Sequence, residues 1–275
     1  MSSGHVKYYL FSVDLEDVRD MIPNGYQYKE AVVAPTLKYL DWLKKHNVTA
    51  TFFIVGNTAE KYPDLIREIV KQGHETACHT YDHIHLTKQT PDEFKHDLHK
   101  AVNAIMKSGA NKVVGFRAPT FSLVERSKWA YPILKEAGFT YSSSVLPSAN
   151  PIFGWKNFGG EKMMDGIYEI PMNIGSAPFS VPFGGGTYFR CLPQLILNRL
   201  FSSAAKKHET VLGYFHPYDV NTGQEHFMHP HLNDNKLMNE LMYVNRGKVF
   251  NRLDAIVGQG FKVMRYDEYL KTRTT

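Results

Sequence analysis

The sequence has few of the features that mark secreted, disulfide-bonded or membrane-spanning chains. It holds two cysteines among 275 residues, Cys78 and Cys191, which lie far apart and form no CxxC pair. This argues against a disulfide framework and against a cysteine-rich zinc site. No apolar run reaches the roughly 20 residues that a membrane-spanning helix needs. The first residues lack the charged and then apolar layout of a signal peptide, so we expect a cytoplasmic protein.

A strong excess of charge of one sign is also missing. The 32 Lys and Arg residues exceed the 27 Asp and Glu residues by five, and they are scattered along the chain. This balance favours an ordinary solvated surface over a nucleic-acid footprint, so we expect no nucleic-acid partner. Apolar residues make up 43% of the chain, enough for a sizeable core. Since no repeat or linker divides the sequence, we expect residues 1–275 to form one domain, and the oligomeric state stays open.

Short apolar runs alternate with helix-like stretches, which favours an α/β fold with a mainly parallel sheet and crossover helices. An α/β barrel fits this length as a single domain. The predicted strands are residues 8–13, 49–55, 74–78, 112–116, 139–145, 166–172, 210–215 and 261–265. The predicted helices are residues 35–46, a segment ending at Gly73, 90–109, 127–137, 193–207 and 234–257. The stretches that we expect to be irregular are residues 147–165, 175–191 and 219–233.

The chemically versatile side chains come just after the predicted strands. The carboxylates within residues 14–17 follow the first strand, His79 and His83 follow the third, and Arg117 follows the fourth. His216 follows the strand at 210–215. Barrel enzymes place their sites at this end of the strands, so we expect these side chains to meet in one site.

His79 and His83 lie four residues apart, and on a helical turn this spacing places two side chains on one face. Neutral histidine is the commonest metal ligand in proteins. Together with one carboxylate from residues 14–17, the pair would leave an open position for water, as in catalytic zinc sites. A second carboxylate would act as general base, held charged by Arg117, and His216 would protonate the leaving group. The set suits metal-assisted hydrolysis of an amide or ester.

In this order, the motifs resemble those of the NodB-homology polysaccharide deacetylases, carbohydrate esterase family 4. The resemblance covers about residues 8–217 and rests on four motifs: Asp14-Leu15-Glu16-Asp17, His79-Thr80-Tyr81-Asp82-His83, Arg117-Ala118-Pro119 with Phe121, and Tyr214-Phe215-His216-Pro217. It implies a distorted (β/α) barrel of seven or eight mainly parallel strands. The residues at 117–122 and 216–218 are similar to those of a subgroup linked to bacterial envelope and exopolysaccharide biosynthesis.

The resemblance also implies a role for each motif residue. Asp14 would be the general base, positioned by Arg117, and His216 would be the general acid. His79 and His83 would bind a divalent metal ion. Zinc is the commonest assumption for this family, while cobalt, nickel and manganese stay open.

Three features depart from the family pattern, one of them being Tyr141-Ser142-Ser143-Ser144, where Tyr-Asp-Ser-Ser is often seen. Leu15 stands where a second Asp is usual, so the third ligand would be Glu16 or Asp17. In an extended strand Asp14 and Glu16 point the same way, which favours Glu16, whereas a turn beginning at Leu15 would favour Asp17. The family's fourth motif, with Asp and Trp, is not recognisable in this sequence.

The substrate side is less well marked than the metal side. We expect Pro119, Phe121, Trp155 and Tyr188 to bind substrate, although for the last two, plain packing stays open beside sugar stacking. The triple glycine at 184–186 is not followed by Lys and Ser or Thr, so it is no phosphate-binding loop. It indicates a tight turn with close backbone approach.

The resemblance implies hydrolysis of the N-acetyl group of an amino sugar, with release of acetate, in a bacterial polysaccharide or lipopolysaccharide (O-antigen) pathway. The expected partner is an N-acetylated sugar or oligosaccharide. Two alternatives stay open: another C–N amide hydrolase, similar to allantoinase-like relatives, and a non-catalytic carbohydrate-binding homologue. His226, His229 and His231 form a local cluster, for which an exposed loop is the favoured interpretation over a second metal site.

Overall fold

In the computed structural model, the described residues form one sheet of nine strands with the order β6-β7-β5-β4-β3-β2-β1-β8, and β9 pairs with β1. The structure describes residues 6–148, 154–175, 181–207, 210–230 and 232–273. The strands are β1 (Tyr8–Leu15), β2 (Thr51–Ile54), β3 (Glu75–Cys78), β4 (Gly115–Phe116), β5 (Tyr141–Ser142), β6 (Lys162–Met164), β7 (Ile167–Glu169), β8 (Val211–Phe215) and β9 (Lys262–Met264). All pairs are parallel except β6 with β7, which confirms the predicted α/β barrel class.

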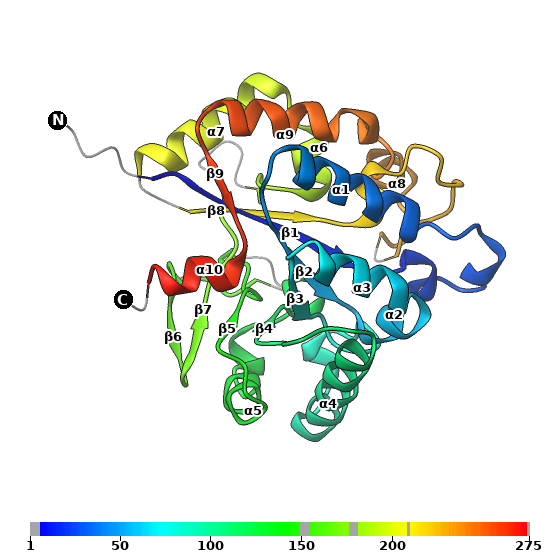
Figure 1. Cartoon of the computed structure of the whole chain (residues 1–275), viewed down its shortest axis with the longest axis vertical. Helices are drawn as coiled ribbons and strands as arrows, with labels where there is room; N and C mark the ends of the chain where they lie inside the picture. The colour runs from blue at the N-terminus through cyan, green and yellow to red at the C-terminus, as the bar shows by residue number, and fades with distance from the viewer. Residues whose placement is uncertain (1–5, 149–153, 176–180, 208–209, 231, 274–275) are drawn as a thin grey trace.

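Helices follow most strands and cover the sheet. They are α1 (Val33–Lys45), α2 (Gly56–Lys61), α3 (Pro63–Lys71), α4 (Pro91–Lys107), α5 (Ala130–Glu136), α6 (Gly186–Cys191), α7 (Gln194–Lys206), α8 (Lys236–Leu241), α9 (Val249–Gly258) and α10 (Tyr266–Lys271). Figure 1 shows β1 beside β8 in the middle of the molecule, with α1, α7 and α9 on one side and α4 and α5 on the other. Within the part of the chain that the structure describes, no helix combines the length and apolar character needed to cross a membrane.

Strand β1 separates the apolar core from the polar interior of the curved sheet. Alternate side chains of a strand point to opposite faces. One face of β1 joins the core between the sheet and the helices through Tyr9, Phe11, Val13 and Leu15. The other face carries Leu10, Ser12 and Asp14, all buried. The sequence alternation therefore aims Asp14 into the interior of the sheet, at the carboxyl end of its strand.

Local sequence signals set the ends of several elements. Helix α4 begins with a capping box, in which Glu93 N donates to Thr90 Oγ1 at 3.3 Å and Thr90 N donates to Glu93 Oε2 at 2.8 Å. Pro91 takes the first helical position, as the sequence predicts. At the triple glycine, a Cβ on Gly184 or Gly185 would lie 2.0 Å from a backbone oxygen of β8. This close approach confirms the interpretation of the glycines and brings α6 against β8.

The structure corrects three of the expected boundaries. Strand β6 lies within the expected loop 147–165 and forms a hairpin with β7 around Asp165-Gly166, both with positive φ. An Asp-Gly pair between two strands is a strong hairpin signal. Helix α6 lies within the expected loop 175–191, and α10 follows the last strand. The single helix expected over 234–257 is divided into α8 and α9, because Asn245 between them has a φ of 57°.

Candidate active site

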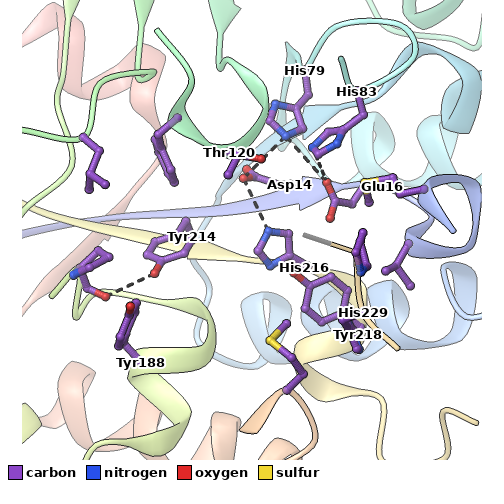
Figure 2. A pocket seen from close by; sticks show the side chains of 17 residues that line it. Asp14, Glu16, His79, His83, Thr120, Tyr188, Tyr214, His216, Tyr218 and His229 are labelled. Carbon is purple, nitrogen blue, oxygen red and sulfur yellow. Dashed lines mark hydrogen bonds and ion pairs between the residues drawn. The ribbon is translucent and has the colours of Figure 1, made fainter. Parts of the chain in front are cut away.

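The predicted site residues meet at the carboxyl ends of four strands. Asp14 lies near the carboxyl end of β1 and Glu16 directly after it, the histidine pair follows β3, Arg117 follows β4 and His216 follows β8. Except for Arg117, which lies fully buried behind them, they line a cavity of about 310 Å³. Figure 2 shows their side chains converging on it from opposite walls. The structure therefore brings together the groups that the sequence placed after separate strands.

Glu16, His79 and His83 form the group suited to a metal ion. One ligand atom from each lies within 4.8 Å of the others, and it is the one such group of three or more residues among those described. Glu16 Oε2 lies 2.8 Å from His83 Nε2 and 3.9 Å from His79 Nε2. His79 Nδ1 lies 2.8 Å from the carbonyl oxygen of Arg117, so Nδ1 donates there and Nε2 keeps its lone pair. A hydrogen bond of this kind, from the ring nitrogen that does not bind the metal, orients histidine ligands in metal sites.

The state of these atoms fits a cation between them. Glu16 Oε2 is buried, and its 2.8 Å contact with His83 Nε2 leaves it without a further hydrogen bond within the described residues; the buried His83 Nδ1 makes none there. Burial by itself would raise the pKa of Glu16, but His83, His216 and His79 lower it to about 2. Burial and the neighbouring His83 lower the pKa of His79 well below its usual value. A charged carboxylate beside neutral imidazoles is the donor set of a catalytic zinc site.

The histidine pair does not lie on a helical turn, and that part of the expectation is wrong. The residues between β3 and Leu86 are irregular. Thr80 and His83 take left-handed conformations, with φ of 64° and 55°. Left-handed backbone is unfavourable for a β-branched residue such as Thr80 and often marks functional sites. The resulting turn brings the ring centres of His79 and His83 to 4.9 Å, so the sequence spacing leads to proximity by a different backbone route.

Asp14 faces the metal-ligand group with one oxygen and Arg117 with the other. Arg117 Nη1 donates to Asp14 Oδ1 at 2.6 Å, and Asp14 Oδ2 lies 3.9 Å from His79 Nε2. Arg117 is fully buried, and its other donors contact Ser12 Oγ, Ser143 and the Tyr266 hydroxyl. Burial would lower the pKa of Arg117, yet Asp14 raises it above its usual value, so the guanidinium stays charged.

Asp17 takes a different role from Glu16. Its carboxylate accepts hydrogen bonds from Arg19 N at 3.1 Å and from the Arg19 guanidinium at 2.5 to 3.1 Å. In this way it caps the short helix Val18–Met21. The Tyr62 hydroxyl lies 3.3 Å from the same carboxylate. Of the two carboxylates left open by the sequence, Glu16 is the one beside the histidines.

The sequence reasoning missed the partners of His216. Its Nδ1 donates to Asp219 Oδ2 at 2.9 Å, and its backbone N donates to the same oxygen at 2.8 Å. Asp219 Oδ1 accepts from Arg190 Nε at 2.8 Å, and both of these side chains are fully buried. His216 Nε2 is left facing Asp14 Oδ2 at 4.0 Å. The carboxylate three residues after a strand-end histidine was the available signal, whereas Arg190 lay in an expected loop.

This arrangement keeps His216 protonated near neutral pH. Burial would lower its pKa, but the charge of Glu16 and the hydrogen bond and charge of Asp219 raise the pKa to about 9. Burial would raise the pKa of Asp219, but Arg190 and His216 hold it well below its usual value. The Tyr218 ring stacks on His216 with ring centres 4.6 Å apart and fixes its plane.

Two of the four expected substrate-binding residues line the cavity. They are Phe121 and Tyr188, and Phe121 sits in a left-handed turn with φ of 52°. Pro119 is buried and lies outside the lining. Trp155 also lies outside it, because its ring packs edge-on against Phe158 at 4.9 Å beside the main core. For Trp155, packing is therefore the interpretation that fits.

The histidine cluster at 226–231 is only partly a surface feature. His229 is buried, with 2% of its surface exposed, and lines the cavity, so the expected exposed loop is wrong at this residue. His226 stacks on Tyr243 with ring centres 3.8 Å apart. His231 lies outside the described residues.

A parallel sheet that carries two histidines, two carboxylates and a protonated imidazole at its carboxyl edge is typical of metal-dependent hydrolases. A family model described as Polysaccharide deacetylase matches residues 25–142. Residues 25–142 thus match the polysaccharide deacetylase family, which confirms the resemblance drawn from the motifs. A second model, described as a domain of unknown function (DUF3473), matches residues 143–271. The first match contains His79, His83 and Arg117, and the second contains His216.

Individual relatives agree with this placement. The chain is 38% identical over 96 residues to a peptidoglycan-N-acetylglucosamine deacetylase of Bacillus cereus, covering 34% of this chain and 35% of the relative. It is 42% identical over 66 residues to a chitooligosaccharide deacetylase of a Bradyrhizobium species, covering 24% of this chain and 30% of the relative. The chain thus spans about a third of the length of these relatives.

Solved structures share the fold over nearly the whole chain. A putative polysaccharide deacetylase from Mycobacterium smegmatis superposes with a TM-score of 0.59 at 18% identity, covering 97% of this chain and 95% of the other. A family 4 carbohydrate esterase pseudoenzyme from Bacillus anthracis superposes with a TM-score of 0.55 at 16% identity, covering 96% of this chain and 66% of the other. At such identities the likeness concerns the fold alone.

Proposed function

We propose that this protein is a metal-dependent deacetylase that removes the acetyl group from an N-acetylated amino sugar of a bacterial polysaccharide or lipopolysaccharide. One observation carries the proposal. Asp14 Oδ2 lies about equally far from a ligand nitrogen of His79, at 3.9 Å, and from His216 Nε2, at 4.0 Å. A proton acceptor, a metal-ligand group and a proton donor therefore surround one point in the cavity, as amide hydrolysis requires.

The residues fit a bound divalent ion, for which we propose zinc. Glu16, His79 and His83 would hold it, since their ligand atoms converge and the buried Glu16 Oε2 contacts the His83 ring at 2.8 Å and makes no further hydrogen bond within the described chain. When bound, such an ion polarises an acyl carbonyl and makes water more acidic. Asp17 would stay with Arg19 as a structural cap.

The side chains of the cavity would divide the proton transfers between them. Asp14 Oδ2 takes the proton of the attacking water, while Arg117 holds Oδ1 and keeps the carboxylate oriented. The water oxygen bonds to the acetyl carbon, and the C–N bond breaks. His216 Nε2 gives its proton to the departing nitrogen, and the sugar amine and acetate are released. Asp219 and Arg190 keep the His216 ring in place and favour its protonated form.

The size of the cavity bears on the substrate. Its volume of about 310 Å³ lies at the lower end of the range for small-molecule sites, enough for one or two sugar rings. The relatives named above act on peptidoglycan and on chitooligosaccharide, which makes N-acetylglucosamine the first sugar to test. Phe121 and Tyr188 provide aromatic faces for a sugar ring.

Acetate release tests the proposal. The full chain, loaded with zinc, is incubated with chitooligosaccharides of two to five units, peptidoglycan fragments, N-acetylated nucleotide sugars and allantoin, and free acetate is measured. Acetate from any N-acetylated sugar supports the proposal. Hydrolysis of allantoin alone would favour the allantoinase-like alternative, and no hydrolysis by a zinc-loaded protein would favour the non-catalytic one.

A further inference from the structure

His229 lies on a part of the cavity wall to which no role has been assigned so far. This part of the wall comes from Tyr218, His229, Pro230 and Met242, and Figure 2 shows His229 beside Tyr218. The His229 backbone N donates to Asn239 Oδ1 at 2.9 Å, and Asn239 Nδ2 donates to the Phe227 carbonyl at 3.0 Å. These bonds fix the backbone that carries the ring.

A buried arginine lies behind this histidine, on the side away from the cavity lining. Arg246 is 4% exposed and does not line the cavity. Its Nε donates to the Met242 carbonyl at 2.8 Å, and its Nη1 donates to Asn221 O at 3.1 Å and to Gln224 Oε1 at 3.0 Å. Its Nη2 lies 3.2 Å from His229 Nε2. The guanidinium is therefore held on several sides and presents one N–H to the histidine.

This contact determines the tautomer of His229. A guanidinium has donors only, so His229 Nε2 must accept. An imidazole that accepts at Nε2 is neutral and carries its proton on Nδ1. Burial and the charge of Arg246 lower the pKa of His229 to about 3, which agrees with this assignment. The titratable rings that contact it are Tyr218 and Tyr243, whose pKa values burial raises. The charge of Asp219 also raises the pKa of His229, while Arg190 and His216 lower it.

The hydrogen bonds of His229 within the described residues go through its backbone N and its Nε2, and none goes through Nδ1. Nδ1 is also not among the fully buried atoms without a partner, so its N–H is open to the cavity that the residue lines. A donor that faces a cavity is satisfied by water or by a ligand, and a ligand that offers it no acceptor loses about one hydrogen bond. Apart from Tyr218, the nearby lining is apolar, with Val18, Met21 and Met242. The donor is therefore the polar feature of this wall, and it calls for an oxygen atom of the substrate.

We infer that His229 is a substrate-binding residue, which donates its Nδ1–H to a hydroxyl or ring oxygen of the sugar, with Arg246 as the positioning residue that fixes its tautomer. The inference rests on the proposed deacetylase function, because a sugar is the ligand that it names. A donor that stays neutral across the physiological pH range would distinguish an oxygen acceptor from a ligand N–H at this position. It would also leave the charge balance between Asp14 and His216 undisturbed.

Two matched substitutions separate the donor from the acceptor. In His229→Asn the amide nitrogen can replace Nδ1 as the donor, whereas in His229→Gln the amide oxygen can replace Nε2 as the acceptor for Arg246. We expect His229→Gln to lower kcat/KM for chitotriose roughly fivefold to tenfold, mainly through KM, as for one neutral hydrogen bond. His229→Asn should stay within about twofold of the wild type. Equal values for the wild type and both variants would overturn the inference.

The tautomer is tested without turnover. In ¹⁵N-labelled full-length protein, the imidazole nitrogens of His229, assigned by comparison with His229→Gln, should show a protonated Nδ1 at every pH from 5 to 8. Arg246→Met should release this preference. Protonation at Nε2, or titration within that range, would overturn the inference. If wild-type protein released no acetate from any N-acetylated sugar, the proposed function would be wrong. Whether His229 donates to a sugar would then be tested by itself, from a shift of the Nδ1–H signal on adding chitotriose.

Discussion

Replacing Asp219 by asparagine tests how the proposed acid is kept protonated. Asp219 is fully buried and accepts from two bases, His216 Nδ1 at 2.9 Å and Arg190 Nε at 2.8 Å. Asparagine has the same shape, but its side chain carries no charge, and one of its two terminal groups, the amide NH₂, is a donor. It therefore cannot accept from both neighbours, and the amide NH₂ must face either an imidazole N–H or a guanidinium N–H.

The size of the effect follows from the pKa of His216. Its rise from 6.5 to about 9 corresponds to about 3 kcal/mol in favour of the protonated ring. Loss of a hydrogen-bonded carboxylate lowers such a pKa by about 1 to 3 units. If the pKa falls to about 7, the protonated fraction at pH 8 drops roughly tenfold, and the rate should fall with it. A bound cation would offset the charge of Glu16 and lower the pKa of His216 in the wild type and in Asp219→Asn alike. The quantity to measure is therefore the difference in this pKa between the two proteins.

The assay is acetate release from chitotriose as a function of pH, for wild-type protein and Asp219→Asn at equal metal content. The alkaline limb of kcat/KM should move to lower pH in the variant by at least one unit. Asp254→Asn is the matched control, because Asp254 also pairs with a histidine, His46 at 2.8 Å, but does not line the cavity. That variant should keep the wild-type profile. Coincident alkaline limbs for the wild type and Asp219→Asn would refute the reasoning.

Stability gives a second reading of the same substitution. A raised pKa in the folded state means that His216 contributes stability fully below about pH 6.5, and that this contribution is lost as the pH rises through about 9. Metal-free wild-type protein should therefore lose stability over this range, and Asp219→Asn should lose less. The variant should also be less stable overall, by about 3–5 kcal/mol, because Arg190 is left buried without its charged partner. Urea unfolding at pH 6 and pH 9 measures both effects.

Three further substitutions test the remaining assignments. Asp14→Asn should keep the metal and reduce kcat by about 100-fold or more, since the proton acceptor is lost while the ligands remain; unchanged turnover would exclude Asp14 as the base. Glu16→Ala should lower the metal content of purified protein, and Asp17→Ala should retain it, as measured by elemental analysis; the reverse result would exchange their roles. Tyr266→Phe should cost about 1 kcal/mol or more in stability, because Arg117 Nη2 loses its 2.8 Å acceptor inside the sheet, and thermal unfolding with no shift would contradict this.

The sequence predicted the site better than it predicted the backbone around it. Strict alternation along β1 was enough to place Asp14 and Glu16 on the same side, and parallel strands bring their carboxyl ends together wherever the helices lie. From the spacing of His79 and His83 we predicted a helical turn, and that prediction is wrong. The observed loop depends on tertiary contacts, such as the donation from Tyr81 N to Asp97 Oδ2 at 2.9 Å, which no local pattern reveals.

The partners of the proposed acid could not be found from local spacing alone. Arg190 and His216 lie on elements far apart in sequence, and Asp219 joins them only because α6 packs closely against β8 through Gly184 and Gly185. His229 was missed for a related reason, since a polar cluster rich in histidine resembles a surface loop until the chain folds it inward. The single domain, the cytoplasmic location and the absence of a nucleic-acid partner stay predictions.

The central position of β1 has a consequence for how the protein is made. Ser12 pairs with Tyr214, and Tyr8 pairs with Lys262, so the first strand is bordered by segments that the ribosome adds some 200 and 250 residues later. Pairings over such separations slow folding. Until then the edge of β1 stays open, and unpaired edges of this kind promote aggregation. The proposed base therefore lies on a strand whose pairing is complete only after nearly the whole chain has been synthesised. A fragment ending at residue 142 would leave that strand without β8.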